Sequence, residues 1–136
     1  MKVPASGLGD FWGVLGFSIV RADPDEAVVR MDVPDALLSP FGQVLGGMVA
    51  ALFDTALAVA VHRRLGQGGR VATHNLNVTY VAFTTSRRLE CRARTISLRT
   101  RVAIAEGEVL DDAGTLIAKA LGTFGIRRDE APVRTP

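Results

Sequence analysis

An uninterrupted apolar segment in the first half of the chain places the strongest limit on how the protein can fold. Residues 48–65 (MVAALFDTALAVAVHRRL) contain no Gly or Pro and are rich in Ala and Leu, so their composition predicts a helix. Apolar side chains occur on nearly every side of that helix rather than along one stripe. Such a helix needs burial on most of its surface, and the rest of the chain has to supply the cover.

The apolar stretch does not predict a membrane protein. Residues 44–61 approach the length of a membrane span, but they include a glycine pair and, near the middle, Asp54. The N-terminal region has no apolar stretch of the secretory type, and the single cysteine, Cys91, cannot form an internal disulfide. We therefore expect a cytoplasmic protein without a membrane segment or a structural metal.

Strand-like segments flank the predicted helix and supply its cover. Residues 17–21 and 27–33 predict a hairpin, because the second segment alternates apolar and charged side chains after an Asp-Pro-Asp turn. Four longer segments follow the helix, and short turns between them predict a consecutive antiparallel meander. These segments are residues 71–81, 89–98, 102–110 and 115–126. The pattern predicts an α+β domain in which a curved antiparallel sheet wraps round one long central helix.

The length of the chain limits the number of domains. With 136 residues there is room for a single domain, which we place at residues 1–128. Residues 8–15 predict a short N-terminal helix. Residues 129–136 are polar and contain Pro, which predicts a flexible C-terminal tail.

Asp54 is the residue that the helix pattern singles out for chemistry. A carboxylate in the middle of an apolar helix costs several kcal/mol unless it is paired or used. Its neighbours at helical spacing, among them Ala50 and Ala58, cannot neutralise it. Two hypotheses remain open: either Asp54 bonds a backbone amide or an arginine from a strand or another subunit, or it takes part in a reaction.

The pair Gly46–Gly47, just before the apolar segment, is the second candidate. Backbone N–H groups at a helix start have no intrahelical partner and carry the positive end of the dipole, so they can hold an oxyanion or a phosphate. Alternatively, the two glycines simply turn the chain. The pair lies about 12 Å from Asp54 along the helix axis, so one helix cannot bring the two features together.

The two candidates belong to a longer motif. Residues 39–47 (SPFGQVLGG) and 48–56 (MVAALFDTA) resemble the loop and central helix of hotdog-fold acyl-CoA thioesterases, and the phenylacetate-pathway branch is the most similar. The family pattern places His-Gly-Gly three positions after a Gly and an acidic residue seven positions after the last Gly. Gly47 and Asp54 keep that spacing, and residues 112–118 (DAGTLIA) are similar to the family's last turn.

The resemblance implies a homodimer, or a dimer of dimers, whose sheets join edge to edge. Asp54 of one subunit would attack the thioester carbonyl of an acyl-CoA or activate a water molecule. The N–H of Gly46, together with that of Gly47, would stabilise the oxyanion across the interface. Coenzyme A is a good leaving group, so the scheme requires neither a metal nor an organic cofactor.

Three positions depart from the family pattern. Leu45 stands where the family usually has His, Ala58 stands where many relatives have Ser or Thr, and Ser39 stands where relatives often have Asn or Gln. Gln43 and Thr55 are the polar side chains that would compensate. An alternative function is therefore a non-hydrolytic acyl-thioester binding protein that has lost the histidine.

His74 is a further candidate substrate contact. Strict alternation places it on one strand face with Leu76, Val78 and Tyr80, opposite Thr73 and three other polar residues. On that face it either points toward the helix and the thioester or serves as a core histidine.

Positive charge gathers in the middle of the chain. Residues 63–101 contain nine arginines and one acidic residue. Arginine suits bidentate phosphate binding, and the resemblance implies that Arg99 and Arg101 contact the phosphates of coenzyme A. The alternative is a solvated strand face. Nucleic acid is a less favoured partner, because aromatic side chains do not interleave with these arginines.

Overall fold

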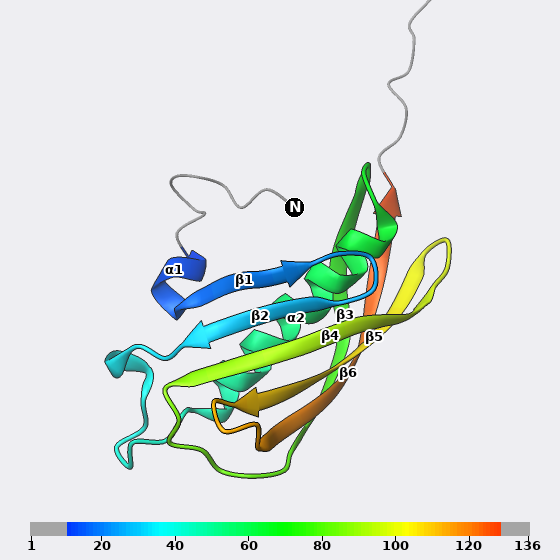
Figure 1. The fold of residues 1–136 in the computed structure, drawn as a ribbon. Helices are drawn as coiled ribbons and strands as arrows, with labels where there is room; N and C mark the ends of the chain where they lie inside the picture. Colours follow the sequence, from blue (N-terminus) through cyan, green and yellow to red (C-terminus); the bar gives the residue numbers. More distant parts are fainter. Residues whose placement is uncertain (1–10, 129–136) are drawn as a thin grey trace, which may run out of the picture.

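The computed structural model describes residues 11–128, which form a single sheet curved round one long helix (Figure 1). The helices are α1 (Phe11–Leu15) and α2 (Gly46–Leu65), and a short 3-10 helix, η2 (Asp35–Leu37), lies between them. The strands are β1 (Phe17–Ala22), β2 (Ala27–Asp32), β3 (Gly69–Tyr80), β4 (Arg88–Leu98), β5 (Val102–Asp111) and β6 (Leu116–Arg128). The predicted α+β class, with a curved antiparallel sheet and a central helix, is confirmed.

The order of the strands corrects one prediction. The sheet runs β1-β2-β4-β5-β6-β3, with every neighbouring pair antiparallel. The hairpin β1–β2 and the meander β4–β5–β6 are as predicted, but β3 pairs with β6 and not with β4. Residues 81–87 therefore form a crossover and not a hairpin turn. Alternation shows which face of a strand is buried but not which strand lies beside it, so the meander of four strands was wrong.

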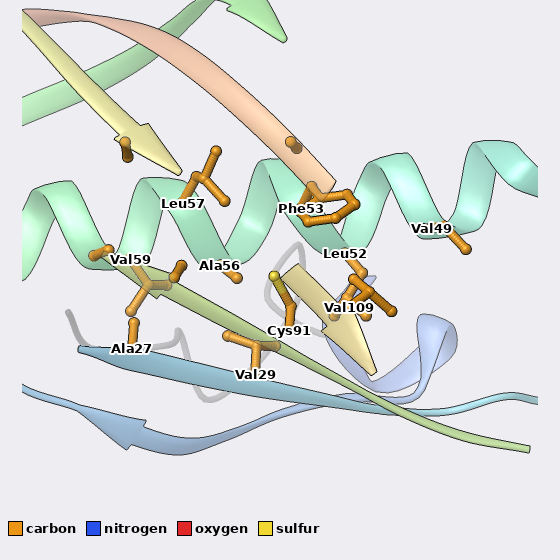
Figure 2. Packing of buried hydrophobic residues seen from close by; sticks show 14 of the residues in the cluster. Ala27, Val29, Val49, Leu52, Phe53, Ala56, Leu57, Val59, Cys91 and Val109 are labelled. Atoms are coloured by element: carbon orange, nitrogen blue, oxygen red, sulfur yellow. The ribbon is translucent and has the colours of Figure 1, made fainter. Parts of the chain in front are cut away.

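The core lies between α2 and the inner face of the sheet. Figure 2 shows Phe53, Leu57 and Val59 of α2 pointing at the strands. Fully buried side chains from four strands meet the helix: Val29 and Met31 of β2, Leu89 and Cys91 of β4, Val109 of β5, and Phe124 of β6. Two glycines allow this close approach, because a Cβ at Gly107 or Gly122 would lie 2.9 Å from a Leu57 methyl group.

One stripe of α2 is left uncovered by its own sheet. The buried residues of the helix face the strands, whereas a stripe through Ala51, Asp54, Thr55, Ala58 and His62 is only half-buried. The predicted burial of most of the helix surface is therefore confirmed only for the sheet-facing side. Beside this stripe lies β3, an edge strand of 12 residues that pairs on one side only and is exposed along much of its length.

Some predictions fall at the ends of the chain. Of the predicted N-terminal helix at residues 8–15, the part from Phe11 onward is seen as α1, while residues 8–10 and the predicted tail at residues 129–136 lie outside the described residues. Between residues 11 and 128, neither helix has the length and apolar character that crossing a bilayer would demand.

Candidate active site

The start of α2 exposes two backbone amides. Leu45 occupies the N-cap position, and its side chain makes no capping hydrogen bond. Its carbonyl oxygen accepts from the N–H groups of Met48 at 2.9 Å and Val49 at 3.3 Å. Within residues 11–128, the N–H groups of Gly46 and Gly47 find no acceptor. A Ser, Thr or Asp at the N-cap would have used one of these donors, so the apolar Leu45 leaves them available to a ligand.

The loop before α2 is held in place by local hydrogen bonds. The Ser39 Oγ accepts from the N–H groups of Phe41 at 3.3 Å and Gln43 at 3.2 Å, and the Ser39 N–H donates to the Gln43 carbonyl at 2.8 Å. The Val44 N–H donates to the Thr84 carbonyl at 3.4 Å, which joins the loop to the crossover. These bonds fix the approach of the chain to Gly46.

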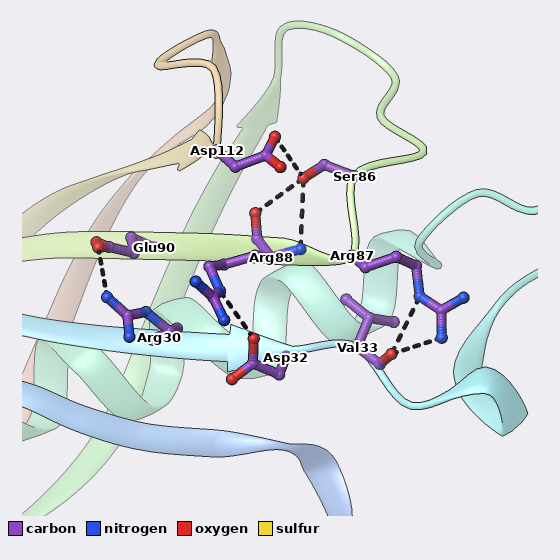
Figure 3. Close-up of polar contacts among 8 residues, drawn as sticks. All are labelled: Arg30, Asp32, Val33, Ser86, Arg87, Arg88, Glu90 and Asp112. Atoms are coloured by element: carbon purple, nitrogen blue, oxygen red, sulfur yellow. Dashed lines mark hydrogen bonds and ion pairs between the residues drawn. The ribbon is translucent and has the colours of Figure 1, made fainter.

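Arg87, just before β4, forms hydrogen bonds to the first part of the segment that leads from β2 to α2. Figure 3 shows the Arg87 guanidinium donating twice to the Val33 carbonyl, with distances of 3.2 Å from Nε and 3.0 Å from Nη2. The same guanidinium pairs with Asp35. Nearby, Arg88 pairs with Asp32 at 3.0 Å, and the Ser86 hydroxyl bonds Asp112 at 3.0 Å. Arg87, a member of the predicted arginine cluster, therefore has a structural role.

A cavity of about 560 Å³ lies against the free amides. It brings together five of the predicted site residues, which come from the loop and the helix start: Ser39, Gln43, Leu45, Gly46 and Gly47. The opposite wall comes from the end of β3, the crossover and β6, and consists of Tyr80, Val81, Ala82, Phe83, Thr84 and Ile117. Among the residues that the structure describes, no charged side chain lines the cavity. The Gln43 side-chain amide has no partner among the described residues and is available to a ligand.

Asp54 is half-buried and lies outside that cavity. Its Oδ1 accepts a hydrogen bond of 2.5 Å from the Thr73 Oγ1 on β3. The partner is neither of those considered from the sequence, a backbone amide or an arginine. Thr55 and Ala58 lie on the same half-buried stripe of the helix. As predicted, one chain keeps the carboxylate and the free amides about 12 Å apart along the helix axis.

A β-bulge corrects the predicted face of His74. The register between β3 and β6 shifts between Thr73 and Asn75, so His74 is an extra residue in its strand. Thr73 therefore shares the inner face with Leu76 and reaches Asp54, whereas His74 is exposed and lies across Gly125 on the outer face. His74 does not point toward the helix and is not a core residue. Strict alternation gave the wrong face because it does not include the inserted residue.

Arg99 and Arg101 lie at the other end of the molecule. Both are exposed on the β4–β5 turn, where the Arg99 N–H donates to the Val102 carbonyl and the Ile126 N–H donates to the Arg101 carbonyl, both at 2.9 Å. Figure 1 shows this turn toward the end where α2 finishes. Within one chain they are therefore not brought together with Gly46 and Gly47.

Two further features lie apart from the amides. A larger groove of about 820 Å³ lies on the outer face of the sheet, lined with charged side chains that include the pair Arg94–Glu106, and it contains none of the predicted site residues. Cys91 is fully buried, and burial raises the pKa of its thiol, with the Glu108 carboxylate adding to the effect. That thiol is thus an unreactive core group.

Comparison with known proteins gives consistent matches. The family model described as the thioesterase superfamily matches residues 41–118. The solved structure of AziG from S. sahachiroi is 29% identical, with a TM-score of 0.82 over 90% of this chain and 99% of its own. A mutant of the phenylacetic acid degradation protein PaaI from Thermus thermophilus is 31% identical, with a TM-score of 0.76 over 85% and 96%. A phenylacetic acid degradation-related protein from Ralstonia eutropha is 31% identical, with a TM-score of 0.79 over 88% and 92%.

These matches define the class of the protein. A sheet of six antiparallel strands curved round one long helix is the architecture of a hotdog-fold protein. The family model covers more than half of the chain, so the protein belongs to the thioesterase superfamily. The predicted family, including its likeness to phenylacetic acid degradation proteins, is confirmed. No functionally curated protein matches the sequence.

Proposed function

We propose that the protein hydrolyses an acyl-CoA thioester to a free acid and coenzyme A. The observation that carries the proposal is the start of α2, where Leu45 provides no cap and the amides of Gly46 and Gly47 adjoin an uncharged cavity. Two donors at the positive end of a helix suit the oxyanion that forms when a thioester carbonyl is attacked. An uncharged cavity suits a neutral acyl group, either aromatic or medium-chain aliphatic.

The catalytic centre is formed by two copies of the chain. Asp54 and the amides are too far apart in one protomer, but a second copy related by a two-fold axis can bring Asp54 to Gly46 of the partner subunit. The half-buried stripe of α2 and the edge position of β3 support this homodimer, because they offer a helix face that is only partly covered and a strand that, among the described residues, has a neighbouring strand on one side only. Two such dimers form the dimer of dimers.

Hydrolysis then follows one of two routes. As a general base, Asp54 takes a proton from water while the water oxygen attacks the thioester carbonyl, and the resulting oxyanion accepts from the Gly46 and Gly47 amides. As a nucleophile, the Asp54 carboxylate forms an acyl anhydride that water then hydrolyses. In both routes the C–S bond breaks and the thiolate of coenzyme A leaves. The Thr73 hydroxyl holds the carboxylate in a fixed orientation.

The other predicted residues position the substrate. Gln43 offers its unpaired amide to the acyl group or the carbonyl, while Ser39 shapes the loop. Thr55 and Ala58 flank the carboxylate on the half-buried stripe. Arg99 and Arg101 lie toward the end of the helix beyond Asp54, where an extended pantetheine arm can carry the phosphates of coenzyme A.

The test is an assay of the purified protein with a panel of acyl-CoAs and a free-thiol readout. Thiol release that depends on Asp54 supports hydrolysis. Saturable binding of an acyl-CoA without thiol release would instead support the alternative, a non-hydrolytic binding protein, which the Leu45 side chain in place of the family's histidine favours. A protein that binds none of the acyl-CoAs would contradict both functions.

Leu45→His is expected to raise kcat. Leu45 lines the cavity beside the free amides, and an imidazole there adds a polar group that can contact the substrate carbonyl. Steady-state kinetics with the best acyl-CoA measure the change, and circular dichroism confirms that the variant is folded. An unchanged or lower kcat in the folded variant would contradict the proposed position of the carbonyl.

Leu45→Asp is expected to have opposite effects on stability and activity. An aspartate at the N-cap accepts from the Gly47 or Met48 amide and complements the helix dipole, so the free energy of unfolding should rise by about 1 kcal/mol. The same carboxylate occupies and repels the oxyanion position, so kcat should fall about a hundredfold. Urea denaturation and thiol release measure the two effects. Leu45→Ala removes the same side chain without adding an acceptor, and it should gain no stability.

A further inference from the structure

Tyr80 forms one wall of the cavity and touches the start of α2 directly. Its hydroxyl donates to the Gly46 carbonyl at 2.5 Å. Its ring lies over the same residue, since a Cβ built on Gly46 would be 3.4 Å from the ring Cζ and the hydroxyl oxygen. The last residue of β3 is thus joined to the first residue of the helix.

Burial does not explain this hydrogen bond. Gly46 is exposed and Tyr80 is 51% exposed, so water could satisfy both the carbonyl and the hydroxyl. The contact holds the first turn of α2 from its carbonyl side. An N-cap side chain that accepts from the Gly47 N–H would hold the same turn from its amide side and would use up one of the two donors that Leu45 leaves free.

The geometry of the peptide group links this contact to the candidate oxyanion site. The Gly46 carbonyl and the Gly47 N–H belong to one planar peptide and point in opposite directions. In a helix the N–H side faces the N-terminus, where the cavity lies. A hydrogen bond to the carbonyl fixes the plane of the peptide and polarises it, which strengthens its N–H as a donor.

We propose that Tyr80 is a positioning residue for hydrolysis, whose hydroxyl orients and polarises the Gly46–Gly47 peptide so that the Gly47 N–H serves as a second oxyanion donor. The inference rests on the proposed thioesterase function. It assigns to the Tyr80 hydroxyl a role that depends on its contact with Gly46, and it explains how a helix that begins with two glycines keeps a defined first turn without a cap.

Tyr80→Phe tests the proposal by removing the hydroxyl and keeping the ring. We expect kcat to fall about tenfold, because one donor is weakened rather than lost, while KM stays within about twofold. Thr79→Val is the matched control, because it removes a hydroxyl from the adjacent position of β3, on the outer face of the sheet. Thr79→Val should keep the wild-type kcat.

A second measurement separates polarisation from a structural role. Tyr80 is the only tyrosine in the chain, so growth on 3-fluorotyrosine alters this side chain alone. Fluorination strengthens the phenol as a hydrogen-bond donor, and at a pH where the phenol keeps its proton we expect kcat to rise about twofold at unchanged KM. A structural contact would not give this increase.

The Tyr80→Phe and 3-fluorotyrosine experiments distinguish failure of this inference from failure of the proposed hydrolysis. A wild-type kcat in Tyr80→Phe would overturn the inference and leave the proposed hydrolysis intact. A lower kcat in Tyr80→Phe without any response to 3-fluorotyrosine would also overturn it, because Tyr80 would then act only as a structural contact. Absence of thiol release by the wild-type protein would remove the proposed function and this inference together. Reduced kcat in Tyr80→Phe together with the fluorotyrosine increase would support it.

Discussion

Asp54→Asn is expected to lower kcat for an acyl-CoA thioester about a thousandfold. The amide has nearly the same shape and can still accept from the Thr73 hydroxyl, so the fold and KM should change little. It can neither take a proton from water nor attack the carbonyl, and loss of a general base or nucleophile typically costs two to four orders of magnitude in rate, about 10²–10⁴. Thiol release under saturating substrate measures the effect. Asp25→Asn, at an exposed carboxylate of the β1–β2 turn, is the control.

A mixing experiment tests whether the carboxylate acts across two chains. Asp54→Asn protomers keep the free amides, and Leu45→Asp protomers keep the carboxylate, so a mixed dimer contains one complete site. Random pairing after co-refolding should restore roughly a quarter of the wild-type activity from two nearly inactive proteins. Additive residual activity alone, in a mixture shown to exchange subunits, would rule out a site shared between protomers.

Gly16→Ala is expected to cost about 3 kcal/mol in the free energy of unfolding. Gly16 has a φ of +75°, where side chains are strained, and a Cβ there would lie 2.0 Å from the Asp32 carbonyl oxygen. The Gly16 carbonyl also accepts the Asp32 N–H at 2.9 Å, so the backbones of the two residues cannot separate without losing this bond. Urea denaturation measures the loss.

Gly114→Ala is the control that separates the two effects expected at position 16, which are backbone strain at positive φ and the clash of the Cβ with the Asp32 carbonyl oxygen. Gly114 has a similar φ of +82°, but a Cβ at this position would have nothing within 4 Å of it. Its replacement should cost about 1 kcal/mol from backbone strain alone. If both variants lost the same free energy of unfolding, the β1–β2 hairpin would have to shift to make room for the methyl group at position 16. That result would contradict the predicted clash with the Asp32 carbonyl oxygen.

The elements of the fold could be predicted because they depend on local patterns. The apolar segment of α2, the alternation in β2 and the short turns of the β4–β5–β6 meander each identify an element within a few residues. Strand order depends on contacts between distant segments. The pairing of β3 with β6 follows from the way the sheet closes round the helix, and no local pattern encodes it.

The residues of the candidate site also form two groups, those that a local sequence pattern identifies and those whose role depends on contacts between distant segments. Gly46, Gly47 and Gln43 could be identified because one continuous segment of sequence supplies them. Thr73 and Tyr80 could not, because their roles depend on how β3 lies against α2. The sequence offered one signal for Thr73, a polar residue in a strand next to a buried helix. Strict alternation placed its side chain on the outer face of the sheet, away from Asp54.

The bulge in β3 is a position at which the strand can shorten by one residue without a change in the chemistry beside Asp54. Thr73 lies opposite Phe124 and Asn75 lies opposite Thr123, so the backbone on both sides of His74 is already in register with β6. A related chain without the extra residue can keep both pairings and the same overall architecture. It would still present the Thr73 hydroxyl to the carboxylate, so among related proteins a change of the residue at position 73 alters this site whereas a deletion at position 74 does not.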